Sequence, residues 1–309
     1  MTLPTISVII PTYNRPAQIA ACLQSLTHLD YPAERWEVIV VDDGGPEPLD
    51  AVAAPFGDRL SLALLRQPNA GPAIARNAGA ERAGGAFLAF TDDDCAPDPG
   101  WLRALAAAWA ETPDQGVGGR TVNALPGNAC AAASQLLVDY VYGYYNRPGP
   151  GGARFFASNN LAFPAEGFRA VGGFDARFGR AASEDRGLCD RWLAAGRRLR
   201  YAPDAVIRHS HAMRLRDYWR QHHHYGVGAY HFHRLRAAGP SNGGLPRLEP
   251  PAFYVGMLTH AFRHAPCGAR PRGILPPLLS ALMGLSQVAS AVGYFGERAR
   301  QARRNGACG

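Results

Sequence analysis

Residues 86–94 have the sequence AFLAFTDDD, in which a short apolar run ends in three consecutive aspartates. Two earlier runs have a similar form. Ile6–Ile10 stops at a proline, and Trp36–Val41 is followed directly by Asp42 and Asp43. Continuous apolar runs of this length, rich in β-branched residues, are typical of strands that are buried on both faces.

Helical patterns separate these expected strands. Pro16–Leu26 carries apolar residues at helical spacing after a proline that suits a first helical position, and Gly71–Ala83 is alanine-rich. The alternation of strand and helix, with a further short strand at Leu60–Leu65, predicts a mostly parallel sheet with helices on both faces. Ligands of such sheets bind beyond the carboxyl ends of the strands, which is where both acidic clusters are expected to lie.

The rest of the chain predicts a mixture of elements, ending in helices. Between Trp101 and Val122 we expect a helix and then a strand, and beyond Leu215 the pattern is helical. Composition predicts loops at 147–152 and 239–251, which are rich in glycine and proline. The remaining expected elements are a helix over 130–145, a strand at Phe155–Phe163, a helix from Glu184 to Ala195, and two short strands at Arg198–Tyr201 and Ala205–His209.

The basic residues exclude several enzyme classes. All 32 of them are arginines in a chain of 309 residues with a net charge of +7. Without lysine, the chain has no P-loop lysine, no kinase strand lysine and no amine for a Schiff base. The charge is also uneven, because residues 1–195 hold 15 arginines and 21 acids, whereas residues 196–309 hold 17 arginines and 4 acids.

The arginine-rich part favours an anionic partner. We expect it to face a phosphorylated ligand or an anionic membrane surface rather than nucleic acid, although a solvated surface explains the same charge. Ile274–Phe295 is the most apolar long segment, but its prolines and polar residues favour a buried or interfacial helix over a spanning one. We predict peripheral membrane association that weakens with salt.

The location of the protein is expected to be cytoplasmic, with contact to the inner face of the membrane. The segment MTLPTISVIIPTYN has neither the basic region nor the long apolar run of a signal peptide. Six cysteines without a CxxC pair favour reduced thiols over a disulfide framework or a structural zinc site.

The triplet Asp92-Asp93-Asp94 predicts a cation site. Three adjacent carboxylates repel one another unless a cation neutralises them, and oxygen ligands suit Mg²⁺ or Mn²⁺. On an extended segment residues i and i+2 share a face, so Asp92 and Asp94 would address one ion while Asp93 turns away. A solvated acidic turn is the alternative. Asp42-Asp43 has two interpretations as well, a contact to a ribose and a cap or turn.

Two further groups, later in the chain, contain candidate catalytic or metal-binding residues. Glu184-Asp185 opens a helix and predicts either a general base or a helix cap. His209 and His211 follow an expected strand, where a neutral imidazole would complete an oxygen-rich metal site or serve a structural role. The run His222–His224 is interpreted as a surface feature, because its rings point in different directions on a helix.

The chain resembles the family 2 glycosyltransferases in the order of its sequence segments. These enzymes have a nucleotide-sugar-binding GT-A fold. The match covers roughly residues 5–211 and is specific because its segments occur together in the family's order. They are SVIIPTYNRP (7–16), VIVVDDGG (38–45), NAGPAIARNAGAERAGG (69–85), FLAFTDDDC (87–95), GGFDARFG (172–179), EDRGLCDRWLAAGRRLRYAP (184–203) and VIRHSH (206–211).

The resemblance implies a role for each residue of the donor site. Thr12, Asp42 and Asp43 would hold the base and ribose of the nucleotide, and Arg76 would lie near the base or the diphosphate. Asp92 and Asp94 match the DxD motif that holds a divalent ion, Mn²⁺ or Mg²⁺, against the diphosphate. Because the middle residue of the motif is usually small, the presence of Asp93 leaves the pair of metal ligands uncertain by one position.

The resemblance also implies the acceptor side of the site. Asp185 matches the catalytic base of inverting family members, with Glu184 supporting it or binding the acceptor. His209 matches a third metal ligand of some relatives, and His211 is the fallback. We therefore expect a GT-A domain over 1–213, divided into a nucleotide-binding half (1–95) and an acceptor half (96–213), and a helical extension over 214–309.

The expected function is transfer of a sugar from a nucleotide-diphosphate sugar to a hydroxyl of a saccharide or lipid-linked acceptor, with inversion. The QxxRW signature of processive synthases is not clearly present, so single transfers are favoured. Transfer to a polyprenyl phosphate is the alternative. A nucleotidyltransferase and a non-catalytic nucleotide-sugar-binding protein are less favoured, because the first strand lacks a glycine-rich segment and Asp92, Asp94 and Asp185 are all present.

Overall fold

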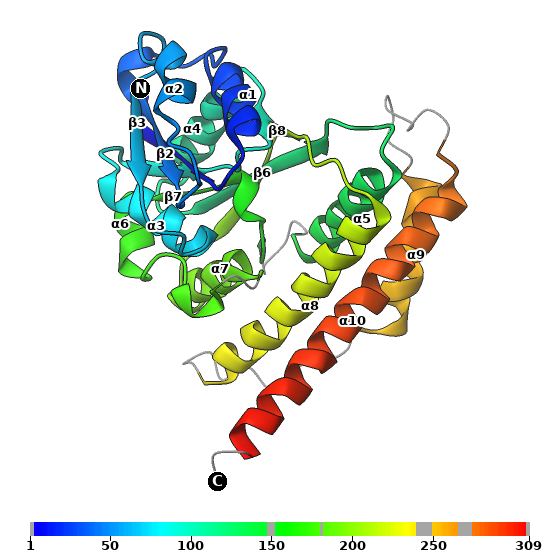
Figure 1. The fold of residues 1–309 in the computed structure, drawn as a ribbon. Coiled ribbons are helices and arrows are strands. Elements are labelled where there is room, and N and C mark those ends of the chain that lie inside the picture. Colours follow the sequence, from blue (N-terminus) through cyan, green and yellow to red (C-terminus); the bar gives the residue numbers. More distant parts are fainter. Residues whose placement is uncertain (1–2, 147–151, 180–181, 239–248, 265–273, 307–309) are drawn as a thin grey trace. The chain divides into compact units, whose positions relative to one another are not determined.

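The computed structural model describes the chain except for residues 1–2, 147–151, 180–181, 239–248, 265–273 and 307–309, and it divides into two compact units (Figure 1). The first unit holds residues 1–122, 145–180 and 185–210, and the second holds 123–144, 181–184 and 211–309. The expected loop at 147–152 and most of the expected break at 239–251 lie outside the described residues.

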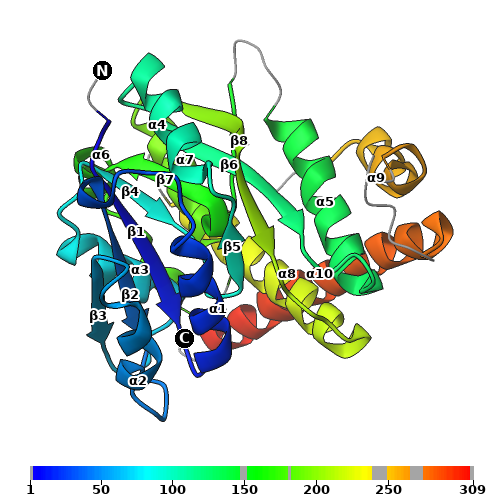
Figure 2. The ribbon, with the colours of Figure 1, turned by 90° about the horizontal axis from the view of Figure 1, so that it is seen from above.

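The first unit is built on one eight-stranded sheet with the order β3-β2-β1-β4-β7-β6-β8-β5. Its first four strands are parallel and lie side by side in Figure 2. Their bounds are β1 Ile6–Thr12, β2 Trp36–Asp42, β3 Leu62–Arg66 and β4 Phe87–Phe90. The helices between them are α1 Pro16–Leu26, α2 Asp50–Ala53 and α3 Pro72–Arg82.

Helices cover both faces of these parallel strands. Val8 belongs to one buried cluster with Leu23 of α1, whereas Gly79 of α3 lies against Ile9 and Val41. Because neighbouring residues of a strand face opposite sides, α1 and α3 must pack on opposite faces. A Cβ at Gly79 would come within 2.6 Å of the Ile9 side chain, so the glycine is needed for the close packing of α3 on the sheet.

The other half of the sheet is antiparallel where its pairing is described, so the sheet as a whole is mixed. Its strands are β5 Cys95–Pro97, β6 Gly116–Asn123, β7 Leu161–Pro164 and β8 Leu199–His209. Its helices are α4 Trp101–Glu111, α6 Ala165–Ala170 and α7 Glu184–Ala194. The two short strands expected at 198–209 form the single strand β8, and the strand expected at Phe155–Phe163 is extended only from Leu161, after a 3-10 turn at Ser158–Asn160.

Two strand registers position the functional residues. Phe90, at the end of β4, pairs with Leu161, at the start of β7. Cys95, at the start of β5, pairs with His209, at the end of β8. The segments that follow β4, precede β7 and leave β8 are therefore brought to one edge of the sheet.

Buried Asn160 fixes the start of β7. Its amide nitrogen donates to the carbonyl oxygens of Arg120 and Ala205, and its amide oxygen accepts from the indole nitrogen of Trp101. A buried polar side chain is stable only when its hydrogen-bonding groups are satisfied. Asn160 therefore ties β7 to β6, β8 and α4.

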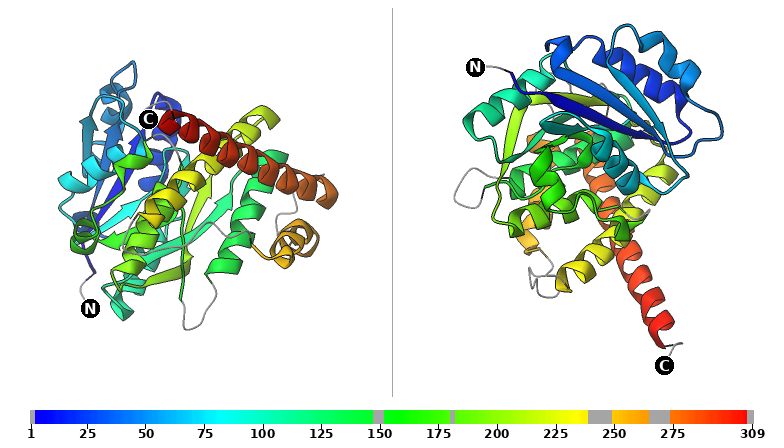
Figure 3. Two further views of the ribbon diagram at one scale, coloured as in Figure 1. Left: turned by 90° about the horizontal axis from the view of Figure 1, so that it is seen from below. Right: turned by 90° about the vertical axis from the view of Figure 1, so that its left-hand side faces the viewer.

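The second unit is helical. Its helices are α5 Ala129–Tyr145, α8 Leu215–Ala237, α9 Pro251–Arg263 and α10 Pro276–Gly306. In Figures 1 and 3, α8 and α10 lie side by side. A Cβ at Gly226 of α8 would come within 1.9 Å of the Ser290 carbonyl oxygen, and one at Gly293 of α10 within 2.1 Å of the His223 carbonyl oxygen, so two glycines allow this close approach.

One helix of the described residues is long and apolar enough to cross a membrane, judged by length and composition alone. This segment is Pro276–Arg304 of α10, and 33% of its most apolar window is buried. It contains most of the segment that we expect to be buried or interfacial. His222, expected on the surface, is instead 1% exposed, and burial lowers its pKa to about 4.

Candidate active site

The aspartate triplet follows β4 and forms a network with two arginines and a histidine. Arg76 of α3 donates to Asp92 at 2.7 Å. Arg15, in the loop after β1, donates to both Asp93 and Asp94, at 2.6 and 3.1 Å. The Nε2 atom of His209 lies 3.1 Å from Asp94. The three carboxylates therefore have different partners.

Asp93 is the carboxylate held inside the protein. It is 3% exposed and accepts a hydrogen bond from the hydroxyl of Thr12 at 2.7 Å. Burial raises its pKa to about 6, against the opposing effects of Thr12 and Arg15. The side chain of Asp92 is more accessible, with 31% of its surface exposed.

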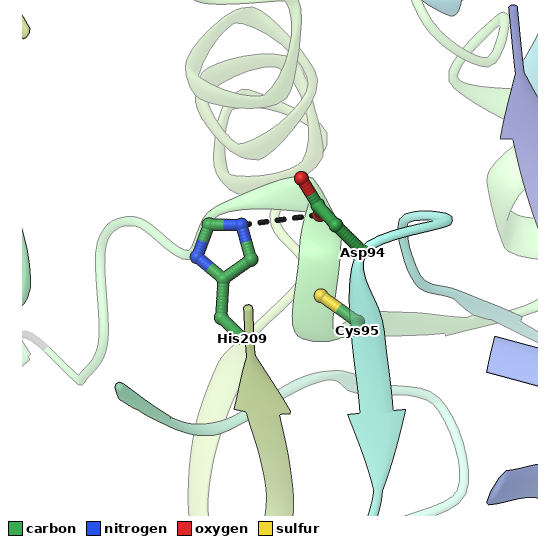
Figure 4. Close-up of side chains that lie close together, drawn as sticks. All are labelled: Asp94, Cys95 and His209. Carbon is green, nitrogen blue, oxygen red and sulfur yellow. Dashed lines mark ion pairs between the residues drawn. The ribbon is translucent and has the colours of Figure 1, made fainter. Parts of the chain in front are cut away.

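Asp94 and His209 have the chemistry of a divalent cation site. Each is a suitable ligand, one through oxygen and one through nitrogen, and together with Cys95 they form a group whose ligand atoms all lie within 4.8 Å of one another (Figure 4). Burial lowers the pKa of His209, but the hydrogen bond and the charge of Asp94 outweigh it, so that the pKa is raised overall. A cation bound by Asp94 would remove this effect and favour the neutral imidazole.

His211 has different surroundings. It belongs to the second unit, where it lines a polar cavity of about 390 Å³. The other lining residues are Ala212, Asp217, Arg220, Gln221 and His224. A contact with the triplet is described for His209, through its ion pair with Asp94.

Asp42 and Asp43 follow β2 and differ sharply in their contacts. Both oxygens of Asp43 are used by the loop before α3: Oδ1 accepts from the backbone nitrogen of Ala70, and Oδ2 from that of Gly71. Asp42 accepts from Gly45 through Oδ1. Its buried Oδ2 receives no hydrogen bond from any described residue, although the Nε atom of Arg66 lies 3.5 Å from it as an ion-pair partner. A buried carboxylate oxygen in this state is suited to accept from a bound ligand.

Asp185 lies at the same edge of the sheet. Its Oδ2 accepts from the backbone nitrogen of Ser158 at 3.2 Å, and its Oδ1 accepts from that of Arg186. Ser158 starts the turn that leads into β7, and the first residue of β7 pairs with Phe90, two residues before Asp92. The base proposed from the sequence and the triplet are therefore held at neighbouring strand ends. Glu184, the other proposed residue, is buried at 7% exposure and is part of the second unit.

Arg15 is a site residue that the sequence did not single out. The loop that contains it follows β1, the neighbour of β4 in the sheet, so a charged residue there can reach the triplet. Asn14, just before it, has a φ angle of +53°, which turns the chain at this point. Cys95 was also missed as a possible ligand, although it directly follows the triplet.

Comparisons with known proteins establish the family. The sequence model of glycosyl transferase family 2 matches residues 7–163, and that of glycosyl transferase family group 2 matches residues 88–292. The first match spans half of the chain, and this protein therefore belongs to glycosyltransferase family 2.

Two curated relatives show how far the sequence similarity extends. Glycosyltransferase AglE of Haloferax volcanii is 38% identical over 134 residues, which cover 42% of this chain and 44% of that protein. The pre-mycofactocin glycosyltransferase of Mycobacterium tuberculosis is 32% identical over 228 residues, which cover 72% of this chain and 46% of that protein. The chain thus spans less than half of the length of these relatives.

Solved structures confirm the expected GT-A fold. The mannosyltransferase PcManGT from Pyrobaculum calidifontis, in complex with GDP-Man and Mn²⁺, matches with a TM-score of 0.65 at 19% identity, covering 96% of this chain and 88% of that one. Staphylococcus aureus TarS 1-349, in complex with UDP-GlcNAc, matches with a TM-score of 0.53 at 17% identity, covering 95% and 91%. Because the sequence identities are only 19% and 17%, these similarities show a shared fold.

Proposed function

We propose that this protein transfers a sugar from a nucleotide-diphosphate sugar to a hydroxyl of a saccharide or lipid-linked acceptor, with inversion and one sugar at a time. The observation that carries the proposal is that two separate acidic groups lie at neighbouring strand ends. The triplet follows β4, and Asp185 of α7 is hydrogen-bonded to Ser158 in the turn that leads into β7. One group suits the leaving diphosphate and the other suits the attacking hydroxyl.

The nucleotide would be held by residues that follow the parallel strands. Asp42 is suited to accept a donor hydrogen from the base or ribose, since its buried Oδ2 receives none from the described residues. Asp43 would act by shaping the loop at 67–71, to which it is bonded. Thr12 would act through Asp93, and Arg76 would place a positive charge beside Asp92, near the diphosphate.

Asp92, Asp94 and His209 would hold the divalent cation, Mn²⁺ or Mg²⁺. When bound, such an ion stabilises the negative charge that develops on the leaving nucleoside diphosphate. Arg15 and Arg76 keep the three carboxylates close together in its absence, because two guanidinium groups offset part of their repulsion. Asp93, held by Thr12 and Arg15, fixes the orientation of the triplet.

Asp185 would take the proton of the acceptor hydroxyl as that oxygen attacks the anomeric carbon. The two backbone hydrogen bonds fix its orientation, and a carboxylate has about four lone-pair sites in total, so it can accept from a substrate as well. Attack from the side opposite the leaving group inverts the anomeric centre. Glu184 would support Asp185 by stabilising the start of α7, because a negative charge is favourable at the N-terminus of a helix.

A polyprenyl phosphate acceptor is the second candidate. The cavity of the second unit favours it, because Arg220, His211 and His224 line it together and are suited to a phosphate group, which would compete with Asp217 for its ion pair with Arg220. A phosphate oxygen is already a nucleophile and needs no general base, so this acceptor would depend much less on Asp185.

The slow hydrolysis of nucleotide sugars tests the proposed function. We expect the purified protein to release nucleoside diphosphate from one donor of a panel of UDP-, GDP- and dTDP-sugars in the presence of Mn²⁺, and to stop when the ion is removed with EDTA. The released nucleoside diphosphate is measured through the inorganic phosphate that an added nucleoside diphosphatase releases from it. If no donor of the panel is hydrolysed or bound, the proposal is wrong.

We further propose that the protein is cytoplasmic and that its second unit contacts the inner membrane surface. Val255 and Phe262 of α9 are 61% and 58% exposed, and Val292 and Phe295 of α10 are 49% and 59% exposed. Exposed apolar side chains next to basic residues are typical of helices that lie at a lipid interface. The basic residues here are Arg298, Arg300, Arg303 and Arg304.

Replacing Arg298, Arg303 and Arg304 by alanine should weaken binding to vesicles of anionic phospholipid by roughly 100-fold at low salt. Each arginine near such a surface contributes about 1 kcal/mol, and each 1.4 kcal/mol is about a tenfold change in affinity. Cosedimentation with vesicles measures the effect, and added salt should weaken the binding of the unmodified protein. The matched control replaces three exposed arginines of the first unit, Arg59, Arg82 and Arg154. An equal loss in the control, or no vesicle binding at low salt, would contradict the proposal.

A further inference from the structure

Cys95 places a sulfur atom beside the proposed cation site. It is 2% exposed, starts β5 and pairs directly with His209 at the end of β8. Residues that pair directly on antiparallel strands point to the same face with closely spaced Cβ atoms. Asp94 supplies the third donor, and Figure 4 shows the three side chains gathered around one point.

The ligand atoms of these three side chains are oxygen, nitrogen and sulfur, unlike those of a site built from oxygen alone. A carboxylate, an imidazole and a thiolate are the ligands that Zn²⁺ prefers, whereas Mg²⁺ and Mn²⁺ favour oxygen. Donor atoms on one zinc ion lie about 3–4 Å apart, since its bonds to oxygen, nitrogen and sulfur are about 2.0–2.3 Å long. Small rotations of the side chains would bring the observed group, spread over 4.8 Å, onto a single ion.

We propose that Cys95 joins Asp94 and His209 in a second binding mode of this site, a tetrahedral Zn²⁺ site that competes with the catalytic cation. The inference rests on the proposed function in that Asp94 and His209 also serve the donor complex. Formation of the zinc–sulfur bond releases the thiol proton to solvent, and no electron transfer is involved.

The local charge supports a dication bound with a thiolate. Among the described contacts of the triplet, three carboxylates meet two guanidinium groups, which leaves one negative charge. Burial and the charges of Asp92 and Asp94 raise the pKa of the Cys95 thiol, so the thiolate would form only as the ion binds. It would add a second negative charge, and Zn²⁺ would neutralise both. The ion can enter from the side of His209, whose side chain is 28% exposed.

Zinc in this mode would inhibit sugar transfer. With three protein ligands, a tetrahedral ion keeps one open position. Mg²⁺ and Mn²⁺, in contrast, are octahedral. Such an ion is bound by one or two carboxylates and has several positions left for phosphate oxygens. A diphosphate that bridges through two oxygens is therefore disfavoured on the zinc-bound site.

Cobalt absorption on the full chain, without nucleotide sugar, tests the site. Co²⁺ replaces Zn²⁺ in tetrahedral sites, and a bound thiolate gives it a near-ultraviolet charge-transfer band. We expect this band in the unmodified protein, its displacement by one equivalent of Zn²⁺, and its loss in Cys95→Ser. The affinity of Cys95→Ser for Zn²⁺ should fall at least about tenfold, because changes even to outer-shell partners of a metal have effects of this size.

Cys22→Ser is the matched control. Cys22 is also buried near the triplet, at 1% exposure, but its sulfur atom lies 3.7 Å from the carbonyl oxygen of Asp92 and is not part of the donor group. The band should persist in this variant. Absence of the band in the unmodified protein, its persistence in Cys95→Ser or its equal loss in Cys22→Ser would each overturn the proposal.

X-ray absorption at the zinc edge keeps the test independent of any variant. In the unmodified protein loaded with one Zn²⁺ we expect one sulfur neighbour at about 2.3 Å, together with nitrogen and oxygen neighbours. A shell of only nitrogen and oxygen would overturn the proposal. Because neither readout involves sugar transfer, failure of the zinc site is distinguishable from failure of the proposed function.

Discussion

Asp185→Asn should lower the rate of sugar transfer to a hydroxyl acceptor by about 10²–10⁴-fold, which is the usual contribution of a general base. The amide keeps the size of the side chain and can still accept through its oxygen, but it cannot take up the proton of the acceptor. Binding of the nucleotide sugar should be nearly unchanged, because the proposed donor contacts come from residues after β1, β2 and β4. Initial rates and equilibrium binding of the donor, measured on the same preparation, separate the two effects.

Asp190→Asn is the control for this experiment. It removes the same charge from the same helix, α7, but at a position without a proposed role in the site. We expect its transfer rate to stay close to that of the unmodified protein. Unaltered turnover in Asp185→Asn would remove the base assignment, and a loss well below 10²-fold with intact donor binding would favour a polyprenyl phosphate acceptor.

Asp94→Asn should lower the cation-dependent release of nucleoside diphosphate by about 10²–10³-fold, the range seen when one preorganised charge-stabilising group is removed. Asp94 contacts both Arg15 and His209, so its replacement removes a proposed metal ligand and leaves the Arg15 guanidinium with one carboxylate instead of two. The apparent affinity for Mn²⁺ should also fall. Titration of the hydrolysis rate with Mn²⁺ measures both quantities, and a high concentration of the ion should restore part of the rate.

Asp98→Asn is the matched control for the metal site. Asp98 lies just after β5 and is ion-paired with Arg208, so the same change in charge occurs nearby on a pair outside the triplet. Its dependence on Mn²⁺ should match that of the unmodified protein. A similar loss in both variants would indicate a general effect of charge, and an unchanged dependence in Asp94→Asn would exclude Asp94 as a cation ligand.

Much of the first half of the fold could be predicted from local sequence. The helix expected at Pro16–Leu26 has the same bounds in the structure, and the ends of the parallel strands differ from expectation by at most two residues. These elements have strong local signals, either a continuous apolar run or helical spacing after a proline. The placement of both acidic clusters at one sheet edge follows from the same pattern.

The antiparallel half could not be predicted in the same way. The strand β7 has only four residues, and its pairing with β4 joins segments that lie more than 70 residues apart. Two short strands were expected at Arg198–Tyr201 and Ala205–His209, but in the structure the chain between them, including the exposed Pro203, continues as the single strand β8. Long-range pairing, rather than local preference, decides both cases.

The contacts between side chains of the site could not be predicted from the sequence either. In the sequence, Asp42 and Asp43 cannot be distinguished, since both follow the same strand. In the structure, Asp43 is hydrogen-bonded to the loop at 67–71, whereas Oδ2 of Asp42 receives no hydrogen bond from the described residues. Arg15 reaches the triplet only because β1 and β4 are neighbours in the sheet. Such differences depend on the three-dimensional arrangement of loops.

The most direct measurement is a crystal structure of the protein with Mn²⁺ and a nucleotide sugar that it binds. We expect the ion between the diphosphate and the carboxylates of Asp92 and Asp94, with the carboxylate of Asp185 facing the anomeric carbon from the opposite side of the sugar. A diphosphate bound away from the triplet, or a sugar whose anomeric carbon Asp185 cannot approach, would contradict this expectation.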